Sequence, residues 1–325
     1  MNASIAGALL LVARKLLTAF VQLLVVATLI FSVMYIMPGD PVLLLLGADS
    51  NPSPEAIAAM RSQLGLDQPV LSQYFVWLWN ALHLDFGKSL TNGYPVANYV
   101  MQNLPRTLEL AVAAIIIAAL IGVPLGIAAA LKRGSMRDTV LTSIATIGIS
   151  VPVYIVGTLL VLFFSLKLGW LPASGYTDIS RNVLEHFRKL ALPAFALGLG
   201  LSASIARMTR SSVLEILGRD FVRALRAKGM SERRISWQHV LRNAAIPIVT
   251  IIGLQLGNLM GGTVLVEAMF NWPGLSTLLV GAVSARNYPL VQGAMLAIAA
   301  AFILINLVVE LLYSLLDPRI RRKRS

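Results

Sequence analysis

Long apolar stretches constrain this chain more than any other feature of its sequence. A helix needs about 20 mainly apolar residues to cross the hydrocarbon core of a bilayer. Six stretches reach or approach that length, and only 13% of the residues are charged, about half the usual share in soluble domains. The sequence therefore predicts an all-α polytopic membrane protein with six transmembrane helices. The expected spans are residues 16–37, 107–131, 139–166, 190–206, 246–269 and 290–316.

Basic residues are distributed unequally between the two ends of these spans. Nineteen of the 27 Lys and Arg residues fall on the side that carries both termini, and five fall in the short loops of the other side. Short cytoplasmic loops carry an excess of Lys and Arg. We therefore expect both termini in the cytoplasm. This pattern accounts for the net charge of +12, and no nucleic-acid partner is expected.

The spans and their connections divide the chain into four parts. Residues 1–37 form an N-terminal segment with the first span, and residues 38–106 are expected to form a helical extracytoplasmic domain. Residues 107–316 form a transmembrane core that includes a basic cytoplasmic loop, 207–243. Residues 317–325 are a basic cytoplasmic tail.

The segment 38–106 contains start and stop signals for helices. Ser53 before Pro54 is typical of a helix N-terminus, and Gly65 is typical of the end of that helix. Further helices are expected to begin near Pro69 and near Pro95. One face of the helix after Pro69 is expected to carry Leu71, Tyr74, Phe75, Leu78 and Leu82.

Glycine recurs every fourth residue inside two spans. Gly253, Gly257 and Gly261 form one stripe along the fifth span, and Gly122 and Gly126 repeat the spacing in the second. Such stripes let helix backbones approach closely, because lipid supplies no hydrophobic drive for helix association. We expect helix packing at these glycines, with a stripe that faces a moving partner as the alternative.

Prolines and acidic residues are the other exceptional residues of the spans. Pro124 and Pro152 are expected to kink their helices. Glu109, Glu267 and Glu310 lie in or beside spans, but none lies at a helix midpoint. A stand-alone ion-coupled carrier would place a carboxylate deeper and would show internal repeats, so this class of transporter is disfavoured.

The sequence offers little for catalysis or metal binding. It contains no cysteine, and its three histidines, His83, His186 and His239, lie outside the apolar stretches. Gly87-Lys88-Ser89 resembles the end of a phosphate-binding loop, but Leu82 stands where that motif requires glycine. We therefore expect neither a catalytic residue nor a metal or cofactor site in this chain.

The loop 207–243 contains an amphipathic segment. Leu214, Leu217, Phe221 and Leu225 are spaced as one apolar helix face, and Gly229 is expected to stop the helix. From these residues alone, two interpretations stay open: the helix lies in the lipid headgroups, or it binds a groove on a cytoplasmic partner. The remaining surface carries Arg219, Arg223, Arg226 and Lys228.

Recognisable motifs occur along nearly the whole chain. One is Phe221-Val222-Arg223-Ala224-Leu225-Arg226-Ala227-Lys228-Gly229, followed by His239-Val240-Leu241-Arg242-Asn243-Ala244. It resembles the ATPase-docking loop in the permeases of binding-protein-dependent ABC importers, specifically the dipeptide, oligopeptide and nickel branch. Further branch-like motifs are Met37-Pro38-Gly39-Asp40-Pro41, Leu64-Gly65-Leu66-Asp67-Gln68-Pro69, Thr107-Leu108-Glu109-Leu110, Lys132-Arg133-Gly134-Ser135, Arg207-Met208-Thr209-Arg210-Ser211-Ser212, Asn271-Trp272-Pro273-Gly274-Leu275 and Tyr288-Pro289-Leu290-Val291-Gln292-Gly293.

The resemblance implies a type I ABC-importer permease in the bacterial inner membrane. Such a subunit pairs with a homologous second permease and binds two cytoplasmic ATPase subunits, which carry ATP and magnesium. An extracytoplasmic solute-binding protein delivers the cargo, which in this branch includes dipeptides, longer peptides, glutathione, opines and chelated nickel. The residues that would meet the ATPase are Leu217, Phe221, Arg223, Ala224, Leu225, Arg226, Ala227, Lys228, Gly229 and His239.

Four positions depart from the typical patterns. Arg223 and Leu225 stand at the first and third places of a motif that begins Glu-Ala-Ala in the wider superfamily; arginine at the first place is similar to the peptide branch. Ser276 stands where the branch often has glycine, and Asn287 where it often has aspartate, so the local turns are expected to differ.

The alternative to a transporter is a membrane anchor or assembly protein whose extracytoplasmic domain binds a partner.

Overall fold

The computed structural model describes residues 2–36, 41–46, 52–63 and 65–316. Within these ranges the chain is helical, and its β pairing is an isolated bridge between Lys88 and Pro95. Residues 37–40 of the motif 37–41, residue 64 of the motif 64–69 and the tail 317–325 lie outside the described residues. The chain divides into two compact units, one of residues 1–107 and 273–304 and the other of residues 108–272 and 305–325.

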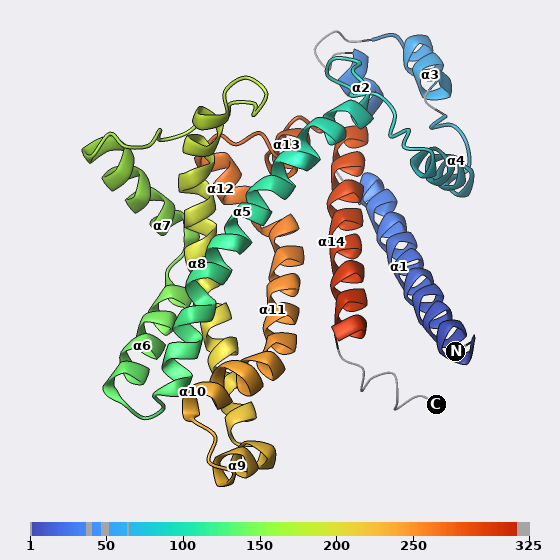
Figure 1. Ribbon diagram of the computed structural model, residues 1–325. Helices are drawn as coiled ribbons and strands as arrows, with labels where there is room; N and C mark the ends of the chain where they lie inside the picture. The colour runs from blue at the N-terminus through green and yellow to red at the C-terminus, as the bar shows by residue number, and fades with distance from the viewer. Residues whose placement is uncertain (1, 37–40, 47–51, 64, 317–325) are drawn as a thin grey trace. The chain divides into compact units, whose positions relative to one another are not determined.

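The first unit contains five complete helices and the beginnings of two long ones (Figure 1). The complete helices are α1 (Asn2–Ile36), α2 (Pro41–Leu46), α3 (Pro54–Gln63), α4 (Val70–Leu82) and α13 (Leu275–Ser284). The long helices that begin here are α5 (Val96–Leu131) and α14 (Tyr288–Leu316).

The second unit contains the rest of α5 and α14 together with the remaining helices. These are α6 (Met136–Ser150), α7 (Val153–Leu160), α8 (Val183–Leu217), α9 (Asp220–Ala227), α10 (Glu232–Arg234), α11 (Leu241–Gly262) and α12 (Val264–Met269), with π-helical turns η2 (Val161–Lys167) and η3 (Ile235–Val240).

Among the residues that the structure describes, the helices long and apolar enough to cross a membrane number five: Val12–Ser32, Val96–Leu131, Val183–Leu217, Glu232–Gly262 and Tyr288–Leu311. The count becomes six if the bent pair Met136–Ser150 and Val153–Lys167 forms one span. The all-α polytopic fold predicted from the apolar stretches is therefore confirmed.

The expected third span, 139–166, is not one continuous helix. Its two halves, α6 and α7 with η2, are bent by 99° (Figure 1). Pro152 has no N–H to donate into the preceding turn, and a residue before proline disfavours the helical conformation. Val151 is accordingly extended, with φ −81° and ψ 122°. The proline breaks the helix here instead of kinking it.

The expected fourth and fifth spans differ from the structure at their ends. The short apolar stretch 190–206 lies within the 35-residue helix α8. Most of the apolar part of α8 is buried inside the protein. The helix can therefore carry polar residues at both ends, beyond the short apolar stretch. The stretch 246–269 is interrupted at Thr263, between α11 and α12. Two consecutive glycines, Gly261 and Gly262, precede the break, and glycine is a poor helix former.

The helix signals in segment 38–106 are found where the sequence places them. The Oγ of Ser53 accepts a hydrogen bond from the backbone N–H of Ala56 at 3.2 Å, which caps α3. Gly65 has φ +67°, a conformation that favours glycine. The helix expected near Pro95 is the start of α5 and continues without interruption into the second span.

The first unit is held together by a buried polar contact as well as by apolar packing. Asn287, 1% exposed, accepts a hydrogen bond from the backbone N–H of Leu90 at 3.1 Å. Its side-chain amide donates to the Oγ of Ser89 at 2.7 Å. Asparagine supplies both a donor and an acceptor, so it satisfies this turn where the branch often has aspartate.

Candidate functional site

The predicted docking segment is a short helix followed by a tight turn. α8 ends at Leu217 and α9 begins at Asp220, so Gly218 and Arg219 separate the two helices. The expected single apolar face is therefore wrong, because its first two leucines belong to α8 and its last two members to α9. Sequence spacing was a poor guide here because it assumed one continuous helix.

The register of α9 is set by Val222. This side chain is fully buried, in a cluster with Val213, Ile235 and Val240. Phe221 is 37% exposed. Leucines at 217 and 225 are partly buried against the same cluster. Val222 thus fixes α9 to the body of the unit and leaves Phe221 at the surface.

A Schellman motif ends α9. The backbone N–H of Met230 donates to the carbonyl of Leu225 at 3.2 Å, and that of Gly229 donates to the carbonyl of Arg226 at 2.9 Å. Gly229 has φ +76°, and its preceding neighbour Lys228 is exposed. A left-handed position of this kind costs other residues about 1–2 kcal/mol. The helix stop predicted at Gly229 is confirmed.

Two arginines of the docking segment are placed differently. Arg226 forms hydrogen bonds to both carboxylate oxygens of Glu232, at 2.6 and 3.1 Å, which joins α9 to α10. These bonds favour the charged guanidinium and raise the pKa of Arg226. Arg223 is 74% exposed and lies 3.5 Å from Asp220 on its own helix. Arg226 stabilises the turn, whereas Arg223 points into solvent.

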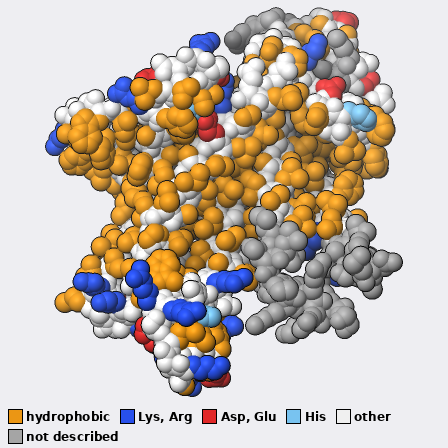
Figure 2. Space-filling view, in the orientation of Figure 1, with side chains coloured by type: hydrophobic (Ala, Val, Ile, Leu, Met, Phe, Trp, Pro, Cys, Tyr) orange, Lys and Arg blue, Asp and Glu red, His pale blue; other side chains and the backbone are white. Residues whose placement is uncertain are grey.

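The remaining predicted docking residues are on the same segment. Ala224 and Ala227 are exposed on α9, and Ala224 is next to Phe221 in the helical repeat. His239 is half-buried in η3, and its carbonyl accepts a hydrogen bond from Asn243 at 2.7 Å. Trp237, in the same turn, is 64% exposed. Figure 2 shows basic side chains gathered over the α9 end of the second unit.

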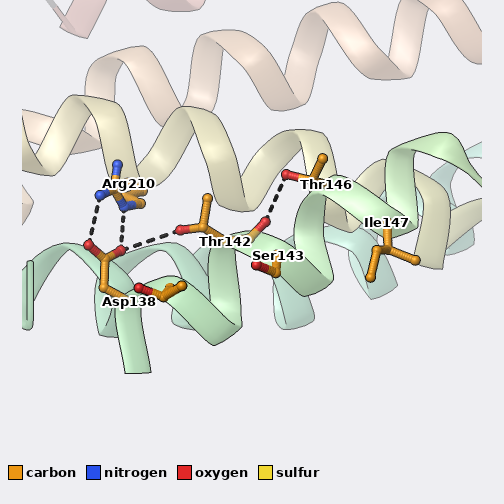
Figure 3. Close-up of a pocket in the computed structure, with 7 residues that line it drawn as sticks. Asp138, Thr142, Ser143, Thr146, Ile147 and Arg210 are labelled. Carbon is orange, nitrogen blue, oxygen red and sulfur yellow. Dashed lines mark hydrogen bonds and ion pairs between the residues drawn. The ribbon is translucent and has the colours of Figure 1, made fainter. Parts of the chain in front are cut away.

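A pocket of about 590 Å³ opens between α6 and α8 (Figure 3). Arg210 of α8 binds both carboxylate oxygens of Asp138 on α6, at 2.7 and 2.8 Å. The backbone N–H of Gly134 donates to the same carboxylate at 3.0 Å. Asp138 is therefore fully engaged and secures the start of α6 to α8. Hydroxyls line the pocket beside this pair: Thr139, Thr142, Ser143 and Thr146.

A buried histidine lies at the opposite end of α8. His186, 1% exposed, has its Nδ1 2.7 Å from the carbonyl of Thr177 and its Nε2 2.5 Å from a carboxylate oxygen of Glu109. The carbonyl can only accept, so Nδ1 carries a proton. Glu109 thus joins α5 to α8.

The glycine stripe of α11 packs unevenly. A Cβ at Gly253 would lie 2.3 Å from Cγ2 of Val309 on α14, and one at Gly257 would lie 3.1 Å from Oδ1 of Asn306. A Cβ at Gly261 would meet nothing within 4 Å. Two of the three glycines therefore lie against α14 in the second unit, and the third faces open space.

Metal-binding potential is low in the described ranges. No group of three or more His, Asp or Glu side chains there is arranged to hold a metal ion.

The apolar helices described above define a polytopic membrane protein. The family of binding-protein-dependent transport system inner membrane components matches residues 122–322, and the N-terminal family of such membrane components matches residues 8–111. The chain belongs to this family and is a permease subunit of an ABC importer.

Curated relatives match almost end to end. A protein described as a putative peptide transport system permease from Brucella abortus (strain 2308) is 40% identical over 311 residues, which cover 96% of this chain and 98% of the relative. The glutathione transport system permease protein GsiC of Salmonella typhi is 42% identical over 312 residues, covering 96% and 99%.

A solved structure shares the fold. A chain of the inward-facing MetNI methionine ABC transporter aligns with a TM-score of 0.57 at 19% identity, covering 67% of this chain and 96% of that chain. At this identity the likeness concerns the fold alone.

Proposed function

We propose that this permease carries peptides or related small solutes and that separate ATPase subunits, with their ATP and magnesium, drive it. The names of the two relatives, a peptide and a glutathione permease, support this cargo class. The chain itself is proposed to be non-enzymatic. Its partners would be a homologous second permease, two cytoplasmic ATPase subunits and an extracytoplasmic solute-binding protein.

The observation that carries the docking proposal is the way α9 is held. Val222 is buried on one face of α9, while the neighbouring Phe221 is exposed on another face. A helix fixed on one side and exposed on the other can transmit a force applied to its exposed side. We therefore assign Phe221, Ala224 and Arg223 to the ATPase contact.

A single substitution tests this assignment. Phe221→Asp places a charge in the proposed contact without entering the core that Val222 occupies, and Ser231→Asp adds the same charge at an exposed position outside α9. We expect Phe221→Asp to abolish copurification of the ATPase subunits and transport, and Ser231→Asp to preserve both. If Phe221→Asp retains the ATPase subunits, α9 rests on lipid headgroups and the assignment is wrong.

The proposed topology places both termini and loop 207–243 in the cytoplasm and residues 38–106 outside. The excess of basic residues on the first of these sides supports it. Reporter fusions after Arg137 and at Ser325 should be cytoplasmic, and a fusion near Gly93 should be extracytoplasmic. A cytoplasmic signal at Gly93 would overturn this orientation.

A further inference from the structure

Helix α4 exposes an apolar face that is unusual for a surface in contact with water. Leu71, Phe75 and Trp79 recur every fourth residue and are 72%, 64% and 64% exposed. None of the 13 residues of α4 is charged. Figure 2 shows hydrophobic side chains over this part of the first unit. Large contiguous apolar patches on a protein surface mark contact with another protein or with a membrane.

The opposite face of α4 packs on α1. The hydroxyl of Tyr74 is 2.8 Å from Oγ1 of Thr28. The rings of Tyr74 and Trp77 lie 5.3 and 5.6 Å from that of Phe31. Ala81 completes the contact in a cluster with apolar residues of α1. The position of α4 against α1 is therefore fixed by several side chains along its length.

This contact sets the depth of α4 relative to the bilayer. The apolar stretch of α1 continues in sequence to residue 37, and the helix itself continues to Ile36. Thr28 and Phe31 lie nine and six residues before the end of that stretch, which at 1.5 Å per residue is about 14 and 9 Å along the helix axis. α4 is thus held beside the C-terminal part of the apolar stretch of α1.

We propose that α4 is an interfacial helix whose Leu71, Phe75 and Trp79 side chains insert into the lipid at the membrane boundary nearest the C-terminal end of α1. α4 packs on a helix that has exposed apolar side chains of its own, such as Leu29 at 61% exposed. Tryptophan is enriched at membrane boundaries, and an apolar face about 5–10 Å into the boundary is typical of interfacial helices. In the proposed topology this is the extracytoplasmic surface.

The absence of cysteine from the sequence makes a direct test possible. Single cysteines replace Leu71, Phe75 or Trp79 and receive a nitroxide label in the assembled importer, in nanodiscs of phosphatidylethanolamine and phosphatidylglycerol. Ala58→Cys, exposed on α3, serves as the control in water. Val21→Cys, exposed on α1, is the lipid reference. Collision rates with oxygen, which concentrates in lipid, and with a water-soluble nickel chelate report the surroundings of each label.

We expect the three α4 labels to show a several-fold higher ratio of oxygen to nickel collisions than Ala58→Cys, and a lower ratio than Val21→Cys. Nickel collisions as frequent as at Ala58→Cys would mean that the face lies in water. Protection from both reagents would mean that a protein subunit covers it. Either result overturns the proposal, and unchanged ATP hydrolysis by each labelled complex confirms that the variants are folded.

Discussion

Two helix contacts in the second unit are built on the same glycine spacing but have different neighbours. On α5, a Cβ at Gly122 or Gly126 would lie 2.5 Å from a backbone carbonyl oxygen of α8, that of Ser202 or Ala206. On α11, the corresponding neighbours are side chains of α14, Val309 and Asn306. A side chain can change its rotamer, whereas a backbone carbonyl moves only with its helix. The same sequence pattern therefore predicts different tolerance to substitution.

The largest effect is expected at Gly126. In Gly126→Ala the new Cβ would lie 2.5 Å from the carbonyl of Ala206 and 2.6 Å from Cβ of Thr209, so α5 and α8 must separate. We expect a loss of about 2–3 kcal/mol or more, at the upper end of overpacking effects. The measurement is the thermal unfolding midpoint of the purified complex. Ala128→Leu, at an exposed position of α5, is the control, and equal midpoints would contradict the α5–α8 contact.

A smaller effect is expected at Gly253. The Cβ of Gly253→Ala would lie 2.3 Å from Cγ2 of Val309, a side chain that resists rotation because it is β-branched. We expect a destabilisation of about 1–2 kcal/mol. The double variant Gly253→Ala/Val309→Ala should recover most of it. A double-mutant cycle with no coupling between the two positions would show that they are not in contact.

The smallest disturbance of this contact is expected at Gly257. A Cβ there would lie 3.1 Å from Oδ1 of Asn306, which needs to shift by only a few tenths of an ångström. Gly257→Ala should change the yield of assembled complex little, whereas Gly257→Leu should lower it by adding bulk. Wild-type yield and transport for Gly257→Leu would mean that this part of α11 does not pack closely.

No steric penalty is expected at Gly261, where a Cβ would meet nothing within 4 Å. Gly261→Ala should leave unfolding unchanged or raise its free energy by up to about 1 kcal/mol, because alanine is the better helix former. Chemical denaturation followed by circular dichroism checks this. A marked destabilisation would show that the stripe continues beyond Gly257.

Much of the fold follows from composition and spacing. Apolar length located the apolar helices but not the breaks at Pro152 and Thr263. Ser53, Gly65 and Gly229 marked helix ends, because these signals act within a few residues. The sequence predicted a kink at Pro152, whereas the structure has a break there. A proline inside a membrane helix is compatible with either outcome, and the surrounding packing decides between them. Pro193 and Pro247 lie inside continuous helices of the same unit.

The candidate site was only partly predictable. The position of α9 was found, but its buried residue, Val222, depends on a break at Gly218 and Arg219 that the leucine spacing did not reveal. Asp138 and Arg210 are 72 residues apart in sequence. Local sequence patterns therefore give no sign that the two side chains meet. The bond from Glu109 to His186, 77 residues away, was inaccessible for the same reason.

The length of α8 has a mechanical consequence. Its 35 residues form one helix about 50 Å long, with His186 anchored near one end and α9 attached at the other. The Asp138–Arg210 pair couples the start of α6 to α8. If the helix tilts as one body, a tilt of about 5° around its midpoint displaces each end by about 2 Å. A movement imposed on α9 would then reach the distant end of the unit to the extent that the break at Gly218 and the proline at Pro193 do not absorb it.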